Sequence, residues 1–340
     1  MNRIYKKIIR TAGWFFLFLF LFTQHAQAHV GYVVPEGEHE ALFGQDFPYL
    51  LSVLRQGEAY IALLVILFTG AFLYYLLTRV ATIRRIEKHT EERVKTYDLF
   101  ISWIIRLSLG ITFIGAGISN TLISPIVLAT PGEAFFEVIV GFLFLAGLFL
   151  APVSFAALAL FVIAYSQESY IAGNLDMLAL TLSFIILANA KPGIDDLVGI
   201  PQATFVKRFK KYVPLVLRTG LGGAMIYLAV YEKILNPHWA ERVIFDYGLG
   251  DFGITPVLWV FGAGVVELLV GLAIFFGFKT RFVSVLALLV LSVSFFYFGE
   301  DVYSHVTLFS SAAILFITDS GDISIDHFIK RKHKRFLLWK

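Results

Sequence analysis

The sequence predicts an all-α polytopic membrane protein of about nine transmembrane helices, arranged as two same-orientation four-helix repeats plus one extra N-terminal span. The first observation is composition: 58% of the 340 residues are apolar and 16% are charged, whereas a soluble domain has roughly 45–50% apolar and about 25% charged residues. The second is arrangement, because the apolar residues form runs long enough to cross ~30 Å of hydrocarbon. The third is an internal repeat within these runs. Together they exclude a soluble enzyme and a disordered chain.

Cysteine content and net charge narrow the function classes further. The chain has no cysteine, which excludes thiol–disulfide chemistry, thiolate metal sites and iron–sulfur clusters. Its net charge is only +3, so nothing points to a nucleic-acid partner. The partner that the composition predicts is the lipid bilayer.

The N-terminus has the three parts of a secretory signal peptide. Residues 1–10 are basic, residues 14–22 form an apolar core, and Ala26-Gln-Ala28 supplies the small residues that a signal peptidase requires. We expect cleavage after Ala28, which makes residues 1–28 a signal peptide and places His29 first in an extracytoplasmic segment, residues 29–56. The alternative is an uncleaved anchor helix, for which the apolar core is short, because a span needs about 20 residues.

Apolar runs then follow one another along the chain. Most have the ~20 residues that a membrane-spanning helix needs, and Pro131 is expected to divide one run into a short outer helix and a true span. The runs lie at about 57–79, 99–120, 126–150, 152–166, 172–190, 213–235, 256–278, 282–298 and 303–318.

These runs divide the chain into five parts after the N-terminal segment. They are a first transmembrane helix with a basic cytoplasmic loop (57–95), a first four-helix repeat (96–192), a cytoplasmic linker (193–211), a second repeat (212–320) and a basic cytoplasmic tail (321–340). Lys and Arg gather in the loop, the linker and the tail, whereas the segments expected outside are rich in Asp and Glu. The positive-inside rule therefore predicts the plasma (inner) membrane of a prokaryote, with the mature N-terminus outside and the C-terminus cytoplasmic.

Charged and small residues occur twice in the same order. Arg-x3-Gly precedes Glu-x3-Gly-x5-Gly in each copy, and each copy has four spans, so an axis along the membrane normal should relate the copies. Small residues at this spacing let membrane helices approach closely. We expect the helices that carry Gly141 and Gly271 to bring the two bundles face to face. The copies consist of Arg106, Gly110, Glu137, Gly141 and Gly147, and of Arg218, Gly222, Glu267, Gly271 and Gly277.

The repeated charges are costly in apolar helices, at ~2.5–3.5 kcal/mol each near the bilayer centre. The economical arrangement is an ion pair within each repeat, Arg106 with Glu137 and Arg218 with Glu267. Such a pair either fixes helix register or serves as a proton relay or a polar pocket for a head group.

Glu232 and Lys233 form a further polar pair, at the predicted outer end of the sixth span. Lys233 can extend its ammonium group to the membrane surface, which would make it an interfacial anchor.

One copy resembles a known family. Arg218-x3-Gly222, then Tyr231-Glu-Lys233-Ile-Leu-Asn-Pro237, then Glu267-x3-Gly271-x5-Gly277 resembles the DoxX family of small four-helix membrane proteins, and residues 99–190 resemble a degenerate version. The resemblance implies a non-catalytic membrane subunit or partner in a quinone-linked or other redox pathway, with redox-complex subunits as partners and quinone as the cofactor. The fused pair, the signal peptide and the extra first span depart from the simple family form.

Two other function classes remain open. The first is a small-molecule or ion transporter built on the duplicated bundle, in which the buried charges line a path, although no pair of interrupted helices is evident. The second is an extracytoplasmic copper site, because the α-amino group and imidazole of His29 would offer Cu(II) a nitrogen pair. His39, His238 or His305 could supply another nitrogen. The alternative is that these three and His29 are separate surface or interface histidines that form no site.

Overall fold

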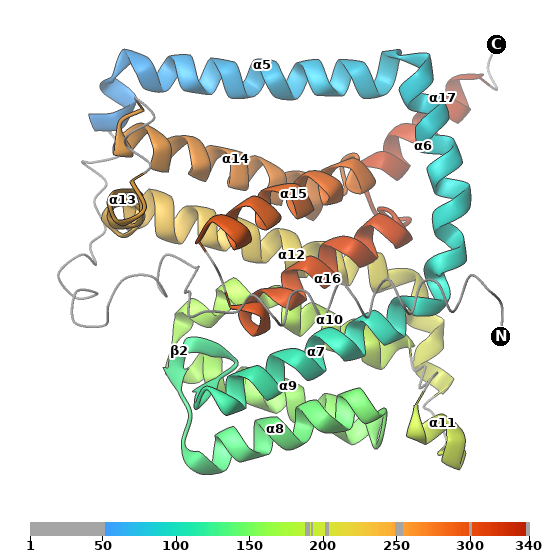
Figure 1. Cartoon of the computed structure of the whole chain (residues 1–340). Coiled ribbons are helices and arrows are strands. Elements are labelled where there is room, and N and C mark those ends of the chain that lie inside the picture. Colours follow the sequence, from blue (N-terminus) through green and yellow to red (C-terminus); the bar gives the residue numbers. More distant parts are fainter. Residues whose placement is uncertain are drawn as a thin grey trace.

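The computed structural model describes residues 52–187, 191, 193–200, 204–248, 254–298 and 301–337. These residues form a helical bundle with one short β-hairpin, and most of the long helices run side by side (Figure 1). The predicted signal peptide, 1–28, and residues 29–51 of the extracytoplasmic segment lie outside the described residues.

The first half of the chain contains two helices before its four-helix portion. Its elements are α5 (Gly57–Arg79), α6 (Ala81–Val94), η1 (Lys95–Phe100), α7 (Ile101–Ile118), β1 (Thr121–Leu122), β2 (Ser124–Leu128), α8 (Pro131–Ala146), α9 (Leu150–Gln167), η2 (Ser169–Asn174), α10 (Leu175–Leu187) and α11 (Ile194–Val198).

The second half again has four long helices, and a short helix stands where the first half has the hairpin. Its elements are η3 (Thr204–Tyr212), α12 (Val213–Val230), the π-helical segment η4 (Tyr231–Leu235), α13 (Pro237–Asp246), α14 (Pro256–Phe276), α15 (Thr280–Phe298), α16 (Val302–Thr318) and α17 (Ile325–Leu337).

Seven helical stretches of the described residues are long and apolar enough to cross a membrane. This confirms the predicted α-helical, polytopic membrane class. The core helices α8 and α16 are apolar but shorter, at 16 and 17 residues. The seven stretches are Gly57–Arg79, Ala81–Ile118, Leu150–Gln167, Ser169–Leu187, Arg208–Leu235, Pro256–Phe276 and Thr280–Tyr297.

The region before Pro131 is not the short outer helix that we expected. Residues 121–128 form the antiparallel pair β1–β2, and α8 begins only at Pro131. Thr130 caps this helix: its hydroxyl oxygen accepts from the Glu133 N–H, and the Glu133 carboxylate accepts from the Thr130 N–H. A capping box followed by proline is a strong helix start, and it prevents the apolar run from continuing as one helix.

Helix α6 covers the end of the bundle where the basic residues gather. It leads from α5 to η1 across the ends of the other helices (Figure 1). We expected only a basic loop here, but the segment is rich in Arg, Lys and Glu, which favour helix. Glu91 and Lys95 form an i,i+4 ion pair of 3.3 Å that supports it. The term basic end is used below for this end of the bundle.

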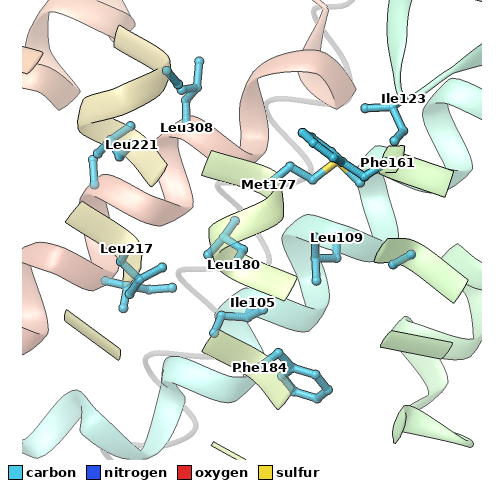
Figure 2. Close-up of a cluster of buried hydrophobic side chains, with 14 of the residues drawn as sticks. Ile105, Leu109, Ile123, Phe161, Met177, Leu180, Phe184, Leu217, Leu221 and Leu308 are labelled. Carbon is cyan, nitrogen blue, oxygen red and sulfur yellow. The ribbon is translucent and has the colours of Figure 1, made fainter. Parts of the chain in front are cut away.

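The four long helices of each half pack in the same order. Helix α7 packs on α8 and α10, and α12 packs on α14 and α16 in the same way. The halves meet through these first and last helices, because α10 also packs on α12 and α7 on α16. Figure 2 shows the shared core, in which Leu109, Leu180, Leu221 and Leu308 come from the four different helices.

The repeated glycines pack inside each half, so the expectation that Gly141 and Gly271 bring the bundles face to face is wrong. A Cβ on Gly141 of α8 would lie 2.7 Å from the Gly110 carbonyl of α7, and one on Gly222 of α12 would lie 2.7 Å from the Gly271 carbonyl of α14. The contact between halves uses other residues: the Thr112 hydroxyl of α7 donates to the Tyr303 carbonyl of α16 at 2.9 Å.

Helix α5 stands at the edge of the bundle, where it packs on α14 (Figure 1). Large apolar side chains remain exposed along it, including Leu64 at 66% and Phe68 at 72%. A soluble protein rarely leaves such a continuous apolar surface uncovered, so hydrocarbon is the solvent that suits this helix.

Candidate functional site

The two repeated arginines cap helix ends at the basic end of the bundle. Arg106 is 3% exposed, and its Nε and Nη2 donate to the Phe144 and Leu145 carbonyls at 2.9 Å each. These carbonyls belong to the last turn of α8, where backbone acceptors have no intrahelical partner. Gly147 ends α8 with a φ of 70°, and a side chain there would collide with the guanidinium.

Arg218 makes the matching contact in the second half. It is 1% exposed, and its Nη1 donates to the Phe275 carbonyl in the last turn of α14 at 3.3 Å. Its Nη2 also donates to the Ile323 carbonyl, which precedes α17. Gly277 ends α14 with a φ of 68° directly against this guanidinium.

The predicted Arg–Glu pairs therefore need correction. Among the described residues, Arg106 forms no ion pair with Glu137, and Arg218 forms none with Glu267. The sequence placed each arginine ~10 Å and its glutamate ~18 Å from the same membrane face. The helix-end carbonyls lie within hydrogen-bond distance of each guanidinium and take the place that the prediction gave to the glutamate.

Two aspartates that the sequence analysis missed stand beside these arginines. Asp195 accepts from the Phe149 and Leu150 N–H groups at 2.8 and 2.9 Å, and so caps the start of α9. Asp326 does the same for α15, through the Lys279 and Thr280 N–H groups at 2.9 and 3.3 Å. Each aspartate lies 46 or 47 residues after the turn that it caps. No local sequence signal marks a capping residue that distant.

Asp326 lies on α17, outside the membrane-spanning helices. The pKa of its carboxyl group is raised above the ordinary value because the group is buried. Burial is the largest cause, and it outweighs the two backbone N–H donors, which lower the pKa. Asp326 is therefore a partly desolvated carboxyl group that caps the start of α15.

Glu137 is fully buried inside the first half, at 0% exposure. Its Oε1 accepts from the Ile123 N–H at 2.9 Å, whereas its Oε2 has no hydrogen-bond partner among the described residues. Ile123 lies in the turn between β1 and β2 with a φ of 67°. Glu137 thus holds a strained turn of the hairpin against α8, which is a positioning role.

Glu267, at the matching place on α14, has a different partner. Its Oε2 lies 3.0 Å from Lys233 Nζ, and the same Nζ lies 2.8 Å from Glu232 Oε2. The three side chains are 27%, 11% and 2% exposed, for Glu267, Lys233 and Glu232 respectively. Two carboxylates thus share one ammonium group in a largely apolar setting.

The π-helical segment η4 is what presents both Glu232 and Lys233 to this ion cluster. Its backbone hydrogen bonds have the i→i+5 spacing of a π-helix. The segment ends at Asn236, whose Nδ2 donates back to the Tyr231 carbonyl at 2.9 Å. Pro237 then starts α13. Such π segments are frequent at functional sites.

Aromatic rings enclose the cluster on the side toward the first half. Tyr170 from η2 donates its hydroxyl to Glu232 Oε1. Its ring packs edge-on or tilted against Tyr227, Tyr231 and Trp239, at centroid distances of 6.4, 5.5 and 6.5 Å. The term Lys233 cluster is used below for Tyr170, Tyr231, Glu232, Lys233 and Glu267.

A small cavity of about 50 Å³ opens beside Lys233, against Val260 and Gly264 of α14. A Cβ added at Gly264 would lie 3.0 Å from the Cβ of Lys233, so a larger residue at this position would push against the lysine side chain. The cavity is lined by apolar residues apart from Lys233, so it places an apolar surface beside the ammonium group.

The predicted histidine sites divide into two groups. His29 and His39 lie outside the described residues, so the copper site at His29 stays a prediction. His238 on α13 lies 3.0 Å from Glu241, and His305 is buried on α16 with Nδ1 2.8 Å from the Ser304 hydroxyl. The described residues contain no group of three His, Asp or Glu that could hold a metal ion.

Comparison with known proteins gives one match. The family model for DoxX matches residues 213–300, which contain α12 to α15 and with them Glu232, Lys233 and Glu267. No curated protein and no solved structure matches the chain. The match falls on the segment in which the sequence motif was strongest, and it agrees with the apolar helices. The chain is therefore a membrane protein that contains a segment matching the DoxX family, at residues 213–300.

Proposed function

We propose that this chain is a non-catalytic integral membrane component of a quinone-linked or other redox pathway, and that the Lys233 cluster is its contact with a quinone head group. The observation that supports it best is the largely buried ion cluster, in which Lys233 lies 3.0 Å from Glu267 and 2.8 Å from Glu232, and in which Glu232 accepts from the Tyr170 hydroxyl. An intramembrane ionisable cluster is by default a functional-site candidate.

The chemistry of the cluster suits a quinone. The partly buried ring of Tyr231 would stack on a flat, apolar ring. The ammonium group of Lys233 can donate to a quinone oxygen, and the carboxylates of Glu232 and Glu267 can accept from a quinol hydroxyl. One site would therefore hold both redox forms, which a partner subunit could use in electron transfer.

We also propose that the chain contains two DoxX-like units in tandem, residues 96–192 and 212–320, joined by the linker 193–211. Matched contacts support this: each half has an arginine on the last carbonyls of its second long helix, a left-handed glycine at that helix end and an aspartate capping the next helix. Helix α5 and the basic segment to residue 95 would be an addition to the pair.

The proposed location is the plasma membrane of a prokaryote, with residues 1–28 removed, the mature N-terminus outside and the basic end of the bundle in the cytoplasm. The basic residues of α6, the linker and the tail at one end of the bundle support this orientation. The Lys233 cluster would then face the outer leaflet.

The test is extraction of the full-length protein in a mild detergent, followed by chromatography of the bound lipids and optical spectra. We expect co-purified quinone in the parent and loss of it in Tyr231→Leu, which removes a stacking ring. Tyr75→Leu is the control, since Tyr75 is 57% exposed on α5. A folded parent that carries no quinone and binds none when it is added contradicts the proposal. Substrate-dependent flux in liposomes would instead favour the transporter.

A further inference from the structure

A second cavity, of about 440 Å³, lies at the basic end, where the two halves meet. Its lining comes from η1 and the start of α7, from η3 and the start of α12, from the start of α15, and from the ends of α10 and α16. Apart from α15, the long helices of this lining are the first and last of each half, so the cavity lies at the seam between the halves. It is far from the Lys233 cluster, which lies at the opposite helix ends.

Three cationic side chains reach this cavity: Lys95, Lys210 and Arg281. Lys210 forms no ion pair with any described residue. Lys95 is 63% exposed and forms an ion pair with Glu91 at 3.3 Å. Asp98 is the single acidic residue of the lining.

Arg281 is the fixed member of the three cations. It is 12% exposed, its Nε donates to the Phe316 carbonyl at 3.2 Å, and its Nη1 lies 3.7 Å from Glu91 and 3.8 Å from Asp319. These two contacts are long for ion pairs, because charge-assisted N–H···O bonds are usually about 2.7–2.9 Å. Arg281 thus keeps donor capacity toward the cavity.

The rest of the lining is mostly apolar, with the hydroxyl groups of Ser102 and Thr318 among it. Leu187, Val213, Pro214 and Ile317 form the wall toward the bundle core, next to the cations. A cavity that is cationic at the membrane surface and apolar toward the hydrocarbon matches a ligand with an anionic head and an apolar tail. Basic pockets between transmembrane helices on the cytoplasmic side hold anionic lipid head groups for this reason.

We propose that this cavity binds the phosphate head group of an anionic phospholipid, with Lys95, Lys210 and Arg281 as the phosphate contacts. The lipid would bridge the two halves at the seam, since Lys95 belongs to the first half and Lys210 and Arg281 to the second. The proposal is independent of the quinone site, because the two sites share no residue and lie at opposite ends of the helices.

The test uses the purified full-length protein in a zwitterionic detergent, with phosphatidylglycerol, phosphatidylcholine or inorganic phosphate as the added probe. Binding is measured by native mass spectrometry and by the melting temperature. We expect phosphatidylglycerol to bind and to raise the melting temperature, and we expect neither phosphatidylcholine nor millimolar phosphate to do so. Lys95→Gln and Lys210→Gln should each weaken phosphatidylglycerol binding about fivefold.

Two further variants complete the test, one as a control and one with the opposite expected effect. Lys330→Gln removes a lysine that is 68% exposed on the tail and outside the cavity, and it should bind as the parent does. Asp98→Asn removes the acidic residue of the lining and should tighten phosphatidylglycerol binding. Equal binding of the two lipids, equal stabilisation by inorganic phosphate, or no change in both Lys210→Gln and Asp98→Asn would each overturn the proposal.

Discussion

Glu267 of α14 pairs with Lys233 across a distance of 3.0 Å, and not with Arg218 of its own repeat motif. The same lysine also holds Glu232, so one ammonium group joins the π-helical end of α12 to the middle of α14. Lys233 thus links the two carboxylates, and Glu232 also accepts a hydrogen bond from the Tyr170 hydroxyl.

We expect Lys233→Met to destabilise the protein strongly. It would remove the ammonium group that Glu232 and Glu267 share, and removing one partner of a buried pair typically costs ~3–5 kcal/mol. The melting temperature in detergent measures the effect. Lys330→Met, on the exposed tail, is the matched control. Equal melting temperatures for the two variants would show that the Lys233 cluster does not stabilise the fold.

Double-mutant cycles should separate the two pairings. Lys233→Met and Glu267→Gln share a contact, so their losses of unfolding free energy should differ from a simple sum by about 0.5–3 kcal/mol. Arg218→Leu and Glu267→Gln share none, and their losses should add within about 0.5 kcal/mol. Strong coupling of Arg218 with Glu267 would restore the pairing that the motif suggested.

The fold class was predictable because hydrocarbon imposes it. Runs of about 20 apolar residues can only be helices in a membrane, and the positions of α5, α7, α12 and α14 follow from the sequence. The hairpin before α8 was not expected, because Pro131 interrupts an apolar run without showing which structure precedes it. The helix α6 was not expected either, because a pattern of charges alone does not distinguish a helix from a loop.

The site was only partly predictable. The sequence analysis identified the charged candidates Arg106, Glu137, Arg218, Glu232, Lys233 and Glu267. It did not predict their partners, because pairing depends on depth in the membrane and on side-chain direction, and sequence spacing does not determine these. Asp195 and Asp326 escaped notice because each caps a turn far away in the chain. Long-range caps of this kind leave no local motif.

Gly147 and Gly199 provide a matched pair for the arginine contact. Both have left-handed backbones, with φ of 70° and 76°, but only Gly147 lies against a side chain, that of Arg106. Gly199→Ala should lose about 1–2 kcal/mol for the left-handed conformation. Gly147→Ala should lose distinctly more, since the new Cβ displaces the guanidinium from the end of α8. Thermal melting of the two variants compares them, and equal losses would contradict the close contact.

Gly271 and Gly262 test helix packing on one and the same helix, α14. A Cβ on Gly271 would meet Ile226 at 3.0 Å, whereas a Cβ on Gly262 would meet nothing within 4 Å. Gly271→Leu should therefore separate α12 from α14 and cost about 1–3 kcal/mol. Gly262→Leu should melt like the parent. The prediction fails if both variants melt alike.

His29 is tested by chemistry at the N-terminus. Mass spectrometry of the purified protein should find His29 as the first residue, because Ala26-Gln-Ala28 precedes it. Copper titration should then show one site that His29→Ala removes and that weakens as the pH falls, because the α-amino group must lose its proton, with a reference pKa of about 7.7–8.0. Retention of residues 1–28 would end this hypothesis, as would unchanged copper binding in His29→Ala.

The hydrogen bond from Thr112 to Tyr303 has a consequence for biosynthesis. The two residues are 191 positions apart, and they join the first long helix of one half to the last of the other. While the ribosome is still making the second half, the face of α7 that will receive α16 has only lipid beside it. The protein thus completes its core only when its last span enters the membrane, and a chain cut short before α16 leaves that face of α7 uncovered for cellular quality control to detect.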